Sequence, residues 1–132
     1  MKIGFVNGCF DILHVGHISL LEFCKSECDY LVVAIDSDDK VKTSKGEGRP
    51  FNNLEDRIVM LKSIRYVDEV KSFESSKELE ELVEYIRPDI MVVGSDWEGK
   101  EVIGSKFAKQ LKYFRRLDGY STTAILENTI NR

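Results

Sequence analysis

The stretch Asn7-Gly-Cys-Phe-Asp-Ile-Leu-His-Val-Gly-His17 decides the fold class and locates the candidate site. It follows residues 2–7, an apolar run that predicts a first strand. It leads into residues 17–28, where Ile18, Leu20, Leu21 and Cys24 recur near helical spacing. A strand, a glycine-containing turn and a helix therefore follow one another within the first 28 residues.

The turn has the chemistry of a phosphate site. A helix N-terminus offers free N–H groups and the positive end of the helix dipole. His14 and His17 flank Gly16, where the missing side chain lets a ligand approach the backbone. Two capping or core histidines are the alternative, but pairing both histidines of the chain here favours function. A metal site is a weaker interpretation, because no third protein ligand is evident.

Outward from this stretch, β-branched runs alternate with helical patterns. Strands are expected at residues 2–7, 30–35, 68–73, 89–93 and 111–115. Helices are expected at residues 17–28, 54–64, 77–86, 105–110 and 121–130. Asn52 or Asn53 is expected to cap the helix that contains Leu54 and Ile64. The polar residues 37–50 predict a mobile loop. This order predicts the α/β class: a single-domain, Rossmann-like, doubly wound parallel five-stranded sheet with helices on both faces, spanning residues 1–132. Ligands bind such sheets at the carboxyl ends of the strands.

Composition excludes several classes of protein. The chain has 132 residues and a net charge of −4, which disfavours wrapping of nucleic acid. No apolar run approaches the ~20 residues of a membrane span, and the first residues do not resemble a signal peptide. The three cysteines, Cys9, Cys24 and Cys28, are an odd set, which favours reduced thiols in a cytoplasmic protein. Core or half-buried thiols are preferred over a zinc site for Cys24 and Cys28.

Residues 8–17 resemble the His-x-Gly-His signature of the cytidylyltransferase-like nucleotidylyltransferases. Residues 119–123 resemble the second signature of that family, a serine/threonine pair that opens the last helix, and the resemblance covers essentially the whole chain. It implies that a phosphate oxygen of an acceptor attacks the α-phosphorus of a nucleoside triphosphate, releasing pyrophosphate. An ionised phosphate needs no general base, so catalysis is positioning and charge neutralisation. Mg²⁺ would arrive with the nucleotide and need few protein ligands, and a homodimer is implied.

The resemblance also distributes roles over the chain. Catalysis is expected from His14, His17 and Lys45, with Lys42 second to Lys45. Nucleotide binding is expected from Gly8, Cys9, Phe10, Gly16, Asp96, Trp97, Arg116, Tyr120, Ser121, Thr122 and Thr123. Acceptor binding is expected from Asp11, Arg57 and Arg65, with a subunit interface as the alternative for Arg65. Without the resemblance, each residue type has an ordinary structural interpretation. Lys42 and Lys45 would lie on a solvated loop, and Arg57 and Arg65 on a helix surface. Trp97 would be a packing residue, and Ser121 would be an N-cap.

Two subfamilies each resemble part of the chain. Residues 96–100, residues 64–70 and Arg116 look like glycerol-3-phosphate cytidylyltransferase. Residues 45–50, 7–11 and 103–105 look like heptose-1-phosphate adenylyltransferase. We expect CTP over ATP, because Trp97 and Arg116 would lie near the base. A nucleotide-binding module without turnover and an RNA-binding protein are the alternatives from other classes. The intact histidine pair opposes the first, and the acidic charge opposes the second.

Overall fold

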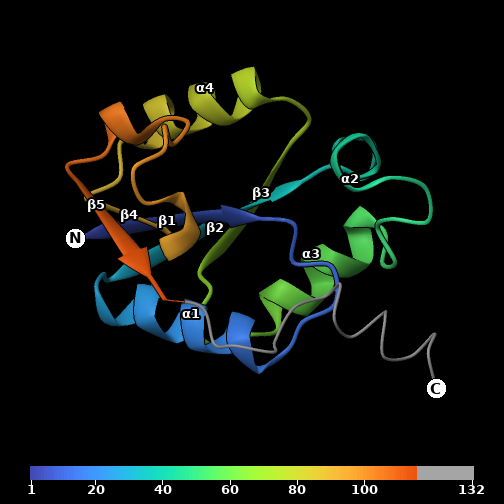
Figure 1. Ribbon diagram of the computed structural model, residues 1–132. Coiled ribbons are helices and arrows are strands. Elements are labelled where there is room, and N and C mark those ends of the chain that lie inside the picture. The colour runs from blue at the N-terminus through green and yellow to red at the C-terminus, as the bar shows by residue number, and fades with distance from the viewer. Residues whose placement is uncertain (116–132) are drawn as a thin grey trace.

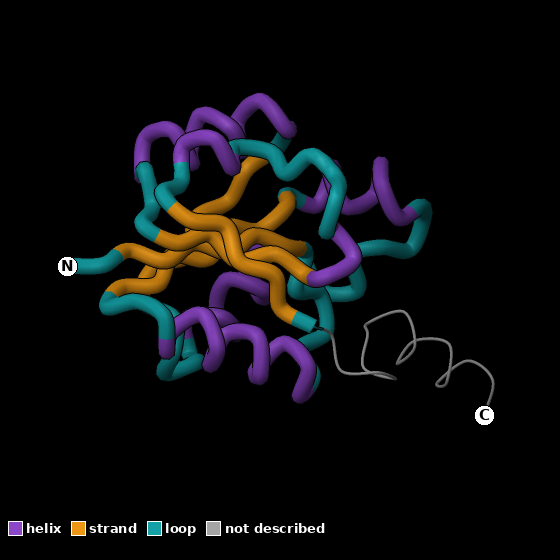
Figure 2. Tube along the Cα trace, turned by 60° about the vertical axis from the view of Figure 1, so that its left-hand side comes forward, coloured by secondary structure: helices purple, strands orange, loops and turns teal. Residues whose placement is uncertain are grey.

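The computed structural model describes residues 1–115, which form one parallel sheet with helices on both faces (Figures 1 and 2). The strands lie in the order β3-β2-β1-β4-β5, and every neighbouring pair is parallel. Their bounds are β1 Ile3–Gly8, β2 Tyr30–Asp36, β3 Glu69–Phe73, β4 Ile90–Gly94 and β5 Gln110–Phe114. The chain order reverses between β1 and β4, and such a switch point is where doubly wound sheets bind ligands. The predicted α/β class and parallel five-stranded sheet are confirmed.

Helices cover the two faces of this sheet unequally. Figure 1 shows α4 on one face and α1 and α3 on the other, while α2 stands apart at the right. Their bounds are α1 Val15–Ser26, α2 Asp38–Lys45, α3 Leu54–Lys62 and α4 Ser76–Ile86, with short 3-10 helices η1 Ser95–Trp97 and η2 Ser105–Phe107. Segments on both faces return the chain from each strand to the next, as the parallel pairing requires.

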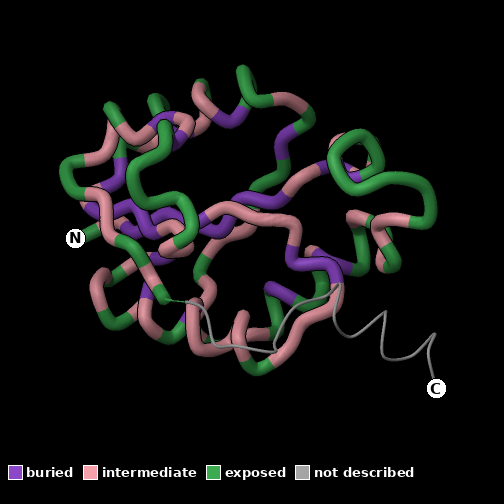
Figure 3. The backbone as a smooth tube through the Cα atoms, in the orientation of Figure 1, coloured by how far each residue is buried: buried purple, intermediate pink, exposed green. Residues whose placement is uncertain are grey.

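Alternation along the strands divides the apolar core into two halves. In β2, Leu31, Val33 and Ile35 pack with α1 and α3, whereas Val32 and Ala34 pack with α4. All five side chains are buried, as expected for a strand covered on both faces. Figure 3 shows the buried residues concentrated in the sheet and the exposed ones along α2 and the segment that follows it.

The largest difference from the expected elements is α2, because residues 37–50 were predicted to be a loop. Ser37 caps the helix by accepting a hydrogen bond from the Lys40 N–H at 3.2 Å. Acidic residues occupy its first turn and lysines its last, which complements the helix dipole. Gly46 ends it with φ +93°, a conformation that suits glycine. Only Val41 is buried, so the apolar periodicity on which helix prediction depends is missing.

Smaller differences concern the ends of the elements. Helix α1 starts two residues before its expected start, because His14 itself is the cap. The expected helix at 105–110 is the single turn η2, and β5 begins one residue early. Of the two predicted caps for α3, Asn53 is the one that accepts from the Asp56 N–H, at 2.9 Å. The expected helix at 121–130 lies outside the described residues.

Aspartates hold the strand starts at the amino edge of the sheet. Asp89 accepts from the Ile3 N–H at 2.7 Å, and Asp68 accepts from the Leu31 N–H at 2.8 Å. A further carboxylate, that of Asp29, accepts from the Lys2 N–H at 2.8 Å. These bonds satisfy backbone donors that parallel pairing leaves open at that edge.

The cysteines agree with a further expectation. Cys24 is buried and Cys28 half-buried, as expected of core thiols, and burial raises the pKa of Cys24 to about 12. Within residues 1–115, no helix has the length and apolar character needed to cross a membrane.

Candidate active site

His14 and His17 lie together at the start of α1, and each ring is held through one nitrogen. The His14 Nδ1 accepts from the Gly16 N–H at 3.1 Å, and the His17 Nδ1 accepts from the His14 N–H at 3.3 Å. This reciprocal arrangement is a capping box made of two histidines. The rings stack with their centroids 3.9 Å apart and their planes at 28°. The structure therefore brings the expected pair together, at the carboxyl end of β1.

The cap determines which ring nitrogen carries the proton. A nitrogen that accepts from a backbone N–H presents its lone pair, so a neutral imidazole in this position carries its proton on Nε2. Both rings are thus fixed as Nε2–H donors. The capping and functional interpretations of the histidines are compatible, because the cap is made through Nδ1 and not through Nε2.

Phe10 supports the histidine pair by packing beside the His17 ring. Its ring is buried in the core half shared with α1, 5.2 Å from the His17 ring centroid. Its φ of +49° lies in the left-handed region, which is uncommon for an aromatic residue. A Cβ on Gly8 would come within 3.1 Å of the Phe10 ring, so glycine keeps this packing relaxed. Gly8 therefore allows the Phe10 ring to approach the backbone closely, and Phe10 lies in the interior beside the His17 ring. The nucleotide contacts expected of Gly8 and Phe10 stay predictions.

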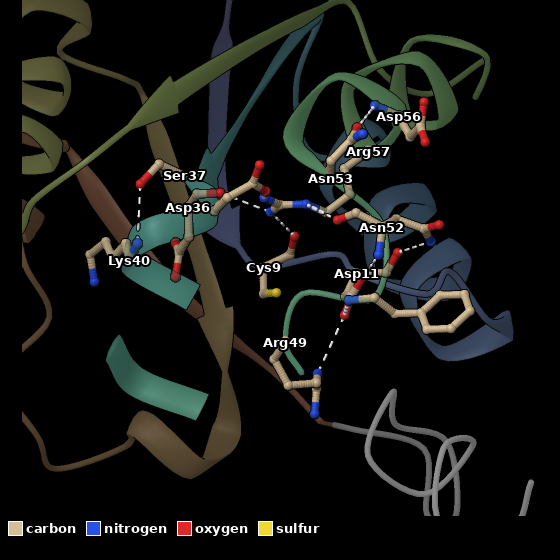
Figure 4. Close-up of polar contacts among 12 residues, drawn as sticks. Cys9, Asp11, Asp36, Ser37, Lys40, Arg49, Asn52, Asn53, Asp56 and Arg57 are labelled. Carbon is tan, nitrogen blue, oxygen red and sulfur yellow. Dashed lines mark hydrogen bonds and ion pairs between the residues drawn. The ribbon is translucent and has the colours of Figure 1, made fainter. Parts of the chain in front are cut away.

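Arg57 joins the ends of three segments from a fully buried position (Figure 4). Its Nη1 donates to the carbonyl oxygens of Cys9 at 3.0 Å and Asp36 at 2.8 Å. Its Nε donates to the carbonyl of Asn52 at 3.1 Å, and its Nη2 donates to Asp38 Oδ1 at 2.7 Å. The helix-surface alternative is wrong for this residue. The side chain has no exposed surface in this structure, which departs from the expected direct contact with an acceptor phosphate.

Asp11 has a similar internal role. One carboxylate oxygen accepts from the Phe51 N–H at 2.7 Å, and the other accepts from the Asn52 N–H at 2.8 Å. Arg49 Nε lies 3.4 Å from the carboxylate, which has no exposed surface. The Asn52 amide also donates to the Asp11 carbonyl at 2.9 Å. Like Arg57, Asp11 holds the segment after α2 instead of presenting a charge to solvent, contrary to its expected place as an acceptor contact.

The carboxyl ends of β1 and β2 lie side by side, and α2 begins directly after β2. Burial raises the pKa of the Cys9 thiol, and Arg57 and Lys45 act against that rise. Burial also raises the pKa of Asp36, opposed by Lys40, Arg57 and Lys45. Lys45, although exposed on α2, thus lies within electrostatic reach of both strand ends. Cys9 remains a thiol at neutral pH and is no candidate nucleophile.

The segment after β4 forms the other side of the switch point. Asp96 and Trp97 belong to η1 and are exposed, Trp97 by 47%. A Cβ on Gly94 would come within 2.7 Å of Asp96 Oδ1, so this carboxylate turns back over the end of β4. Both residues lie at the carboxyl edge of the sheet, and their contact with base or ribose stays a prediction.

Arg65 lies away from this group. It follows α3 on the approach to β3, at the amino edge of the sheet, where its Nη2 donates to the Tyr66 hydroxyl at 2.9 Å. That hydroxyl donates to Glu22 of α1 at 2.7 Å. An acceptor contact within the same chain does not fit this position. The expected contacts at Arg116, Tyr120, Ser121, Thr122 and Thr123 lie outside the described residues.

Comparison with known proteins agrees with this geometry. The model of the family described as "Cytidylyltransferase-like" matches residues 5–128. The chain belongs to this family. The cytidylyltransferase-like assignment confirms the resemblance read from residues 8–17, and it makes the chain a nucleotidylyltransferase.

Curated relatives of this cytidylyltransferase-like chain carry the name "Bifunctional protein HldE". That of Aliarcobacter butzleri is 47% identical over 99% of this chain, and that of Sulfurimonas denitrificans is 47% identical over 96%. The chain spans about a quarter of these relatives, 26% of each. Among solved structures, a lipopolysaccharide core biosynthesis protein from Thermoplasma volcanium is 27% identical, with a TM-score of 0.72 over 89% of this chain and 99% of that one. A pantothenate synthetase from Thermus thermophilus, 13% identical with a TM-score of 0.61 over 96% of this chain and 64% of that one, shares the fold.

Sequence reasoning missed three residues that organise this edge. Asp36, Asp38 and Asn52 meet around Arg57, and none was expected to have a role in the site, since Asn52 was expected only as a possible helix cap. One signal was available for Asp36, which directly follows an apolar strand and so had to lie at the ligand-binding edge. The contacts of Asp38 and Asn52 join positions 5 to 41 residues apart and have no local signature.

Proposed function

We propose that this chain transfers a nucleotidyl group from a nucleoside triphosphate to the phosphate of a sugar, releasing pyrophosphate. The observation that carries the proposal is the histidine pair, whose Nδ1 atoms are both engaged in capping α1. The two Nε2–H groups are then donors of fixed orientation beside a helix N-terminus. Such preorganised donors stabilise charge that develops on phosphate oxygens in the transition state.

The other groups have complementary tasks in this proposal. His14 and His17 hydrogen-bond the α- and β-phosphate oxygens at the switch point, and Lys45 neutralises charge on the departing pyrophosphate. Arg57 and Asp11 act through the backbone, because they fix the segments that carry Cys9 and Asn52. The acceptor phosphate attacks the α-phosphorus as an ionised nucleophile, so no side chain has to remove a proton.

Mg²⁺ is expected to arrive bound to the nucleotide. The described side chains fit Mg²⁺ only in that nucleotide-bound form. Residues 1–115 hold no group of three or more His, Cys, Asp or Glu side chains placed to bind a metal. Mg²⁺ that accompanies a nucleotide takes most of its ligands from phosphate oxygens and water. The proposal therefore assigns it charge neutralisation on the phosphates and none of the side chains described above.

We propose ATP and a heptose-1-phosphate as the substrates. Residues 45–50, 7–11 and 103–105 resemble heptose-1-phosphate adenylyltransferase, and the first two segments are joined by Arg49, whose Nε lies 3.4 Å from the Asp11 carboxylate. The similarity to a lipopolysaccharide core biosynthesis protein supports a surface-glycan substrate. This choice reverses the order expected from sequence, because the similarity to the relatives named "Bifunctional protein HldE" supports the heptose-1-phosphate adenylyltransferase alternative.

CTP with glycerol-3-phosphate is the second candidate. Residues 96–100 and 64–70 favour it by resemblance, and Trp97 lies at the carboxyl edge, where a base would bind.

The experiment is a pyrophosphate-release assay with ATP, CTP, GTP and UTP, each with heptose-1-phosphate or glycerol-3-phosphate. Turnover with ATP and heptose-1-phosphate, at least 100-fold above every other pair, is the expected result. Preference for CTP with glycerol-3-phosphate overturns the substrate choice. Absence of pyrophosphate release with every pair overturns the proposed transfer and favours a binding module.

We also propose that the chain pairs as a homodimer, as the family resemblance implies. Val59 and Met60 expose 61% and 52% of their surface on α3, which leaves apolar surface to cover. Sedimentation equilibrium at micromolar concentration is expected to give twice the monomer mass of 15.1 kDa, and a value near 15.1 kDa contradicts pairing.

A further inference from the structure

Among the described residues at the carboxyl ends of β1 and β2, Asp36 has a carboxylate that no protein group hydrogen-bonds. Its backbone carbonyl accepts from Arg57, but within residues 1–115 no donor hydrogen-bonds its carboxylate. Figure 4 shows the side chain between Lys40 and Cys9. The neighbouring Asp11 and Asp38 carboxylates are both engaged, the first by backbone N–H groups and the second by Arg57.

Burying the charged Asp36 carboxylate costs free energy when no ligand is bound. Asp36 is half-buried, and burial raises its pKa against the opposing effect of Lys40, Arg57 and Lys45. A half-buried carboxylate that lacks hydrogen bonds loses solvation, and the nearby cations offset that loss only in part. Donors that approach it from a bound molecule restore what burial removes.

The strand order says which substrate comes near it. β1 is central, with β4 on one side and β2 on the other. In the proposed function, the histidines hold the phosphates at the end of β1, and Asp96 and Trp97 lie on the β4 side, toward the base. The β2 side is left for the acceptor, and Asp36 is the last residue of β2.

The chemistry of the group then selects a part of the acceptor. A carboxylate repels the phosphate of a sugar phosphate and accepts hydrogen bonds from its hydroxyl groups. Lys40 and Lys45 nearby attract any phosphomonoester and so cannot tell one acceptor from another. A hydroxyl-accepting group beside them discriminates, because an acceptor without the hydroxyl leaves the carboxylate unpaired.

We propose, on the basis of the proposed function, that Asp36 accepts a hydrogen bond from a hydroxyl group of the sugar-phosphate acceptor and thereby selects hydroxylated acceptors in a fixed orientation. The carboxylate touches the substrate, but it takes no proton and neutralises no developing charge in the transfer step. Its effect is on acceptor binding, distinct from that of the histidines on the phosphates of the nucleotide.

The test compares Asp36→Ala and Asp36→Asn with the wild-type chain in steady-state kinetics. The acceptors are heptose-1-phosphate and its 2-, 3- and 4-deoxy analogues. We expect Asp36→Ala to raise the KM for heptose-1-phosphate about 10–100-fold, the worth of one hydrogen bond to a charged group, with kcat and the KM for ATP within about twofold. We also expect the wild-type chain to disfavour one deoxy analogue and Asp36→Ala to lose that preference.

Asp39→Asn is the matched control, since Asp39 is an exposed carboxylate three residues further on in α2. It is expected to leave all parameters unchanged, and thermal unfolding checks that each variant folds. Asp36→Asn keeps the shape of the side chain, so it serves the test if Asp36→Ala unfolds.

Several outcomes overturn the inference. An unchanged acceptor KM does so, and so does an equal loss for heptose-1-phosphate and all its deoxy analogues. A rise confined to the KM for ATP, absent with 2′-deoxy-ATP, assigns the carboxylate to ribose instead and also overturns it. Failure of the wild-type chain to release pyrophosphate is a separate result, which removes the proposed function and this inference with it.

Discussion

His17 has two tasks that it carries out through different atoms. Its Nδ1 accepts from the His14 N–H and so completes the cap of α1, whereas Nε2–H is the proposed donor to phosphate. Asparagine places a hydrogen-bonding atom near the position of Nδ1 but nothing near that of Nε2. The two tasks can therefore be separated by substitution.

We predict that His17→Asn lowers kcat about 10²–10³-fold, the effect of losing one preorganised donor. Its free energy of unfolding should fall by less than about 1 kcal/mol, because the cap is retained. His17→Gln, which keeps an N–H near the position of Nε2, should recover part of the rate. Pyrophosphate release and urea unfolding are the measurements, and near-normal turnover of His17→Asn contradicts the assigned role.

We predict that Arg57 mainly stabilises the fold. It affects function indirectly, by holding the backbone segments of the site in place. Arg57→Ala leaves the carbonyls of Cys9, Asp36 and Asn52 without their donor and should lower the free energy of unfolding by about 3–5 kcal/mol. Arg57→Lys keeps the charge but loses the planar fork, so it should lose less than Arg57→Ala but remain clearly destabilised.

Arg65→Lys, at an exposed arginine, is the control and should stay within about 0.5 kcal/mol of wild type in urea unfolding. If Arg57→Ala is as stable as this control, the network around Arg57 does not hold the segments in place.

At the scale of elements, the strand starts at the amino edge depend on ionised aspartates. The Ile3 N–H and then Lys109 hold the pKa of Asp89 below its ordinary value of 3.8. A carboxyl with a lowered pKa in the folded state stabilises the fold above its unfolded value, and this stabilisation is lost as pH falls through the folded value. Between these two values the unfolded chain binds the proton first, so acid favours unfolding.

We therefore predict that the wild-type chain loses stability as pH falls below 3.8, and that Asp89→Asn loses less over the same range. At pH 7 Asp89→Asn should be the less stable of the two, because its amide is a weaker acceptor than the carboxylate. Urea unfolding at pH 7 and at steps down to pH 3 measures both effects. Glu84→Gln, on the exposed face of α4, should keep the wild-type slope, and an unchanged slope in Asp89→Asn refutes the assignment.

Elements were predictable from sequence where one side of the segment packs against the core. The run at β2 and the spacing of Leu79, Val83 and Ile86 in α4 follow directly from burial. Helix α2 was missed because its stability comes from a Ser37 cap, complementary end charges and Gly46, with one buried side chain. Those end signals are present in the sequence, but without apolar periodicity they resemble a loop.

Site residues divide in the same way. The histidine pair was found because both residues lie within one turn, so sequence spacing equals spatial proximity. Asp11 and Arg57 were located at the correct edge, but their burial depends on Asn52 and Cys9, which are 41 and 48 residues away along the chain from them. No local pattern encodes such contacts, which is why charged side chains with internal partners were expected to face a ligand.

For the molecule as a whole, the strand order connects the fold to the proposed reaction. The strand order reverses between β1 and β4, and this switch point lies at the carboxyl edge of the sheet, where ligands bind. Helix α1 starts at the same edge, with His14 as its cap and His17 in its first turn. The end of α2 brings Lys45 to the same edge, within electrostatic reach of Cys9 and Asp36. Nucleotide on the β4 side and acceptor on the β2 side then meet over β1.

The most direct test of this account is the imidazole nitrogen spectrum of the ¹⁵N-labelled protein, since the chain has only two histidines. The account predicts that both rings are neutral with the proton on Nε2, and that both Nε2 signals shift when a non-hydrolysable ATP analogue is added. If the analogue binds and neither Nε2 signal moves, the histidines do not hold the triphosphate and the central claim is wrong.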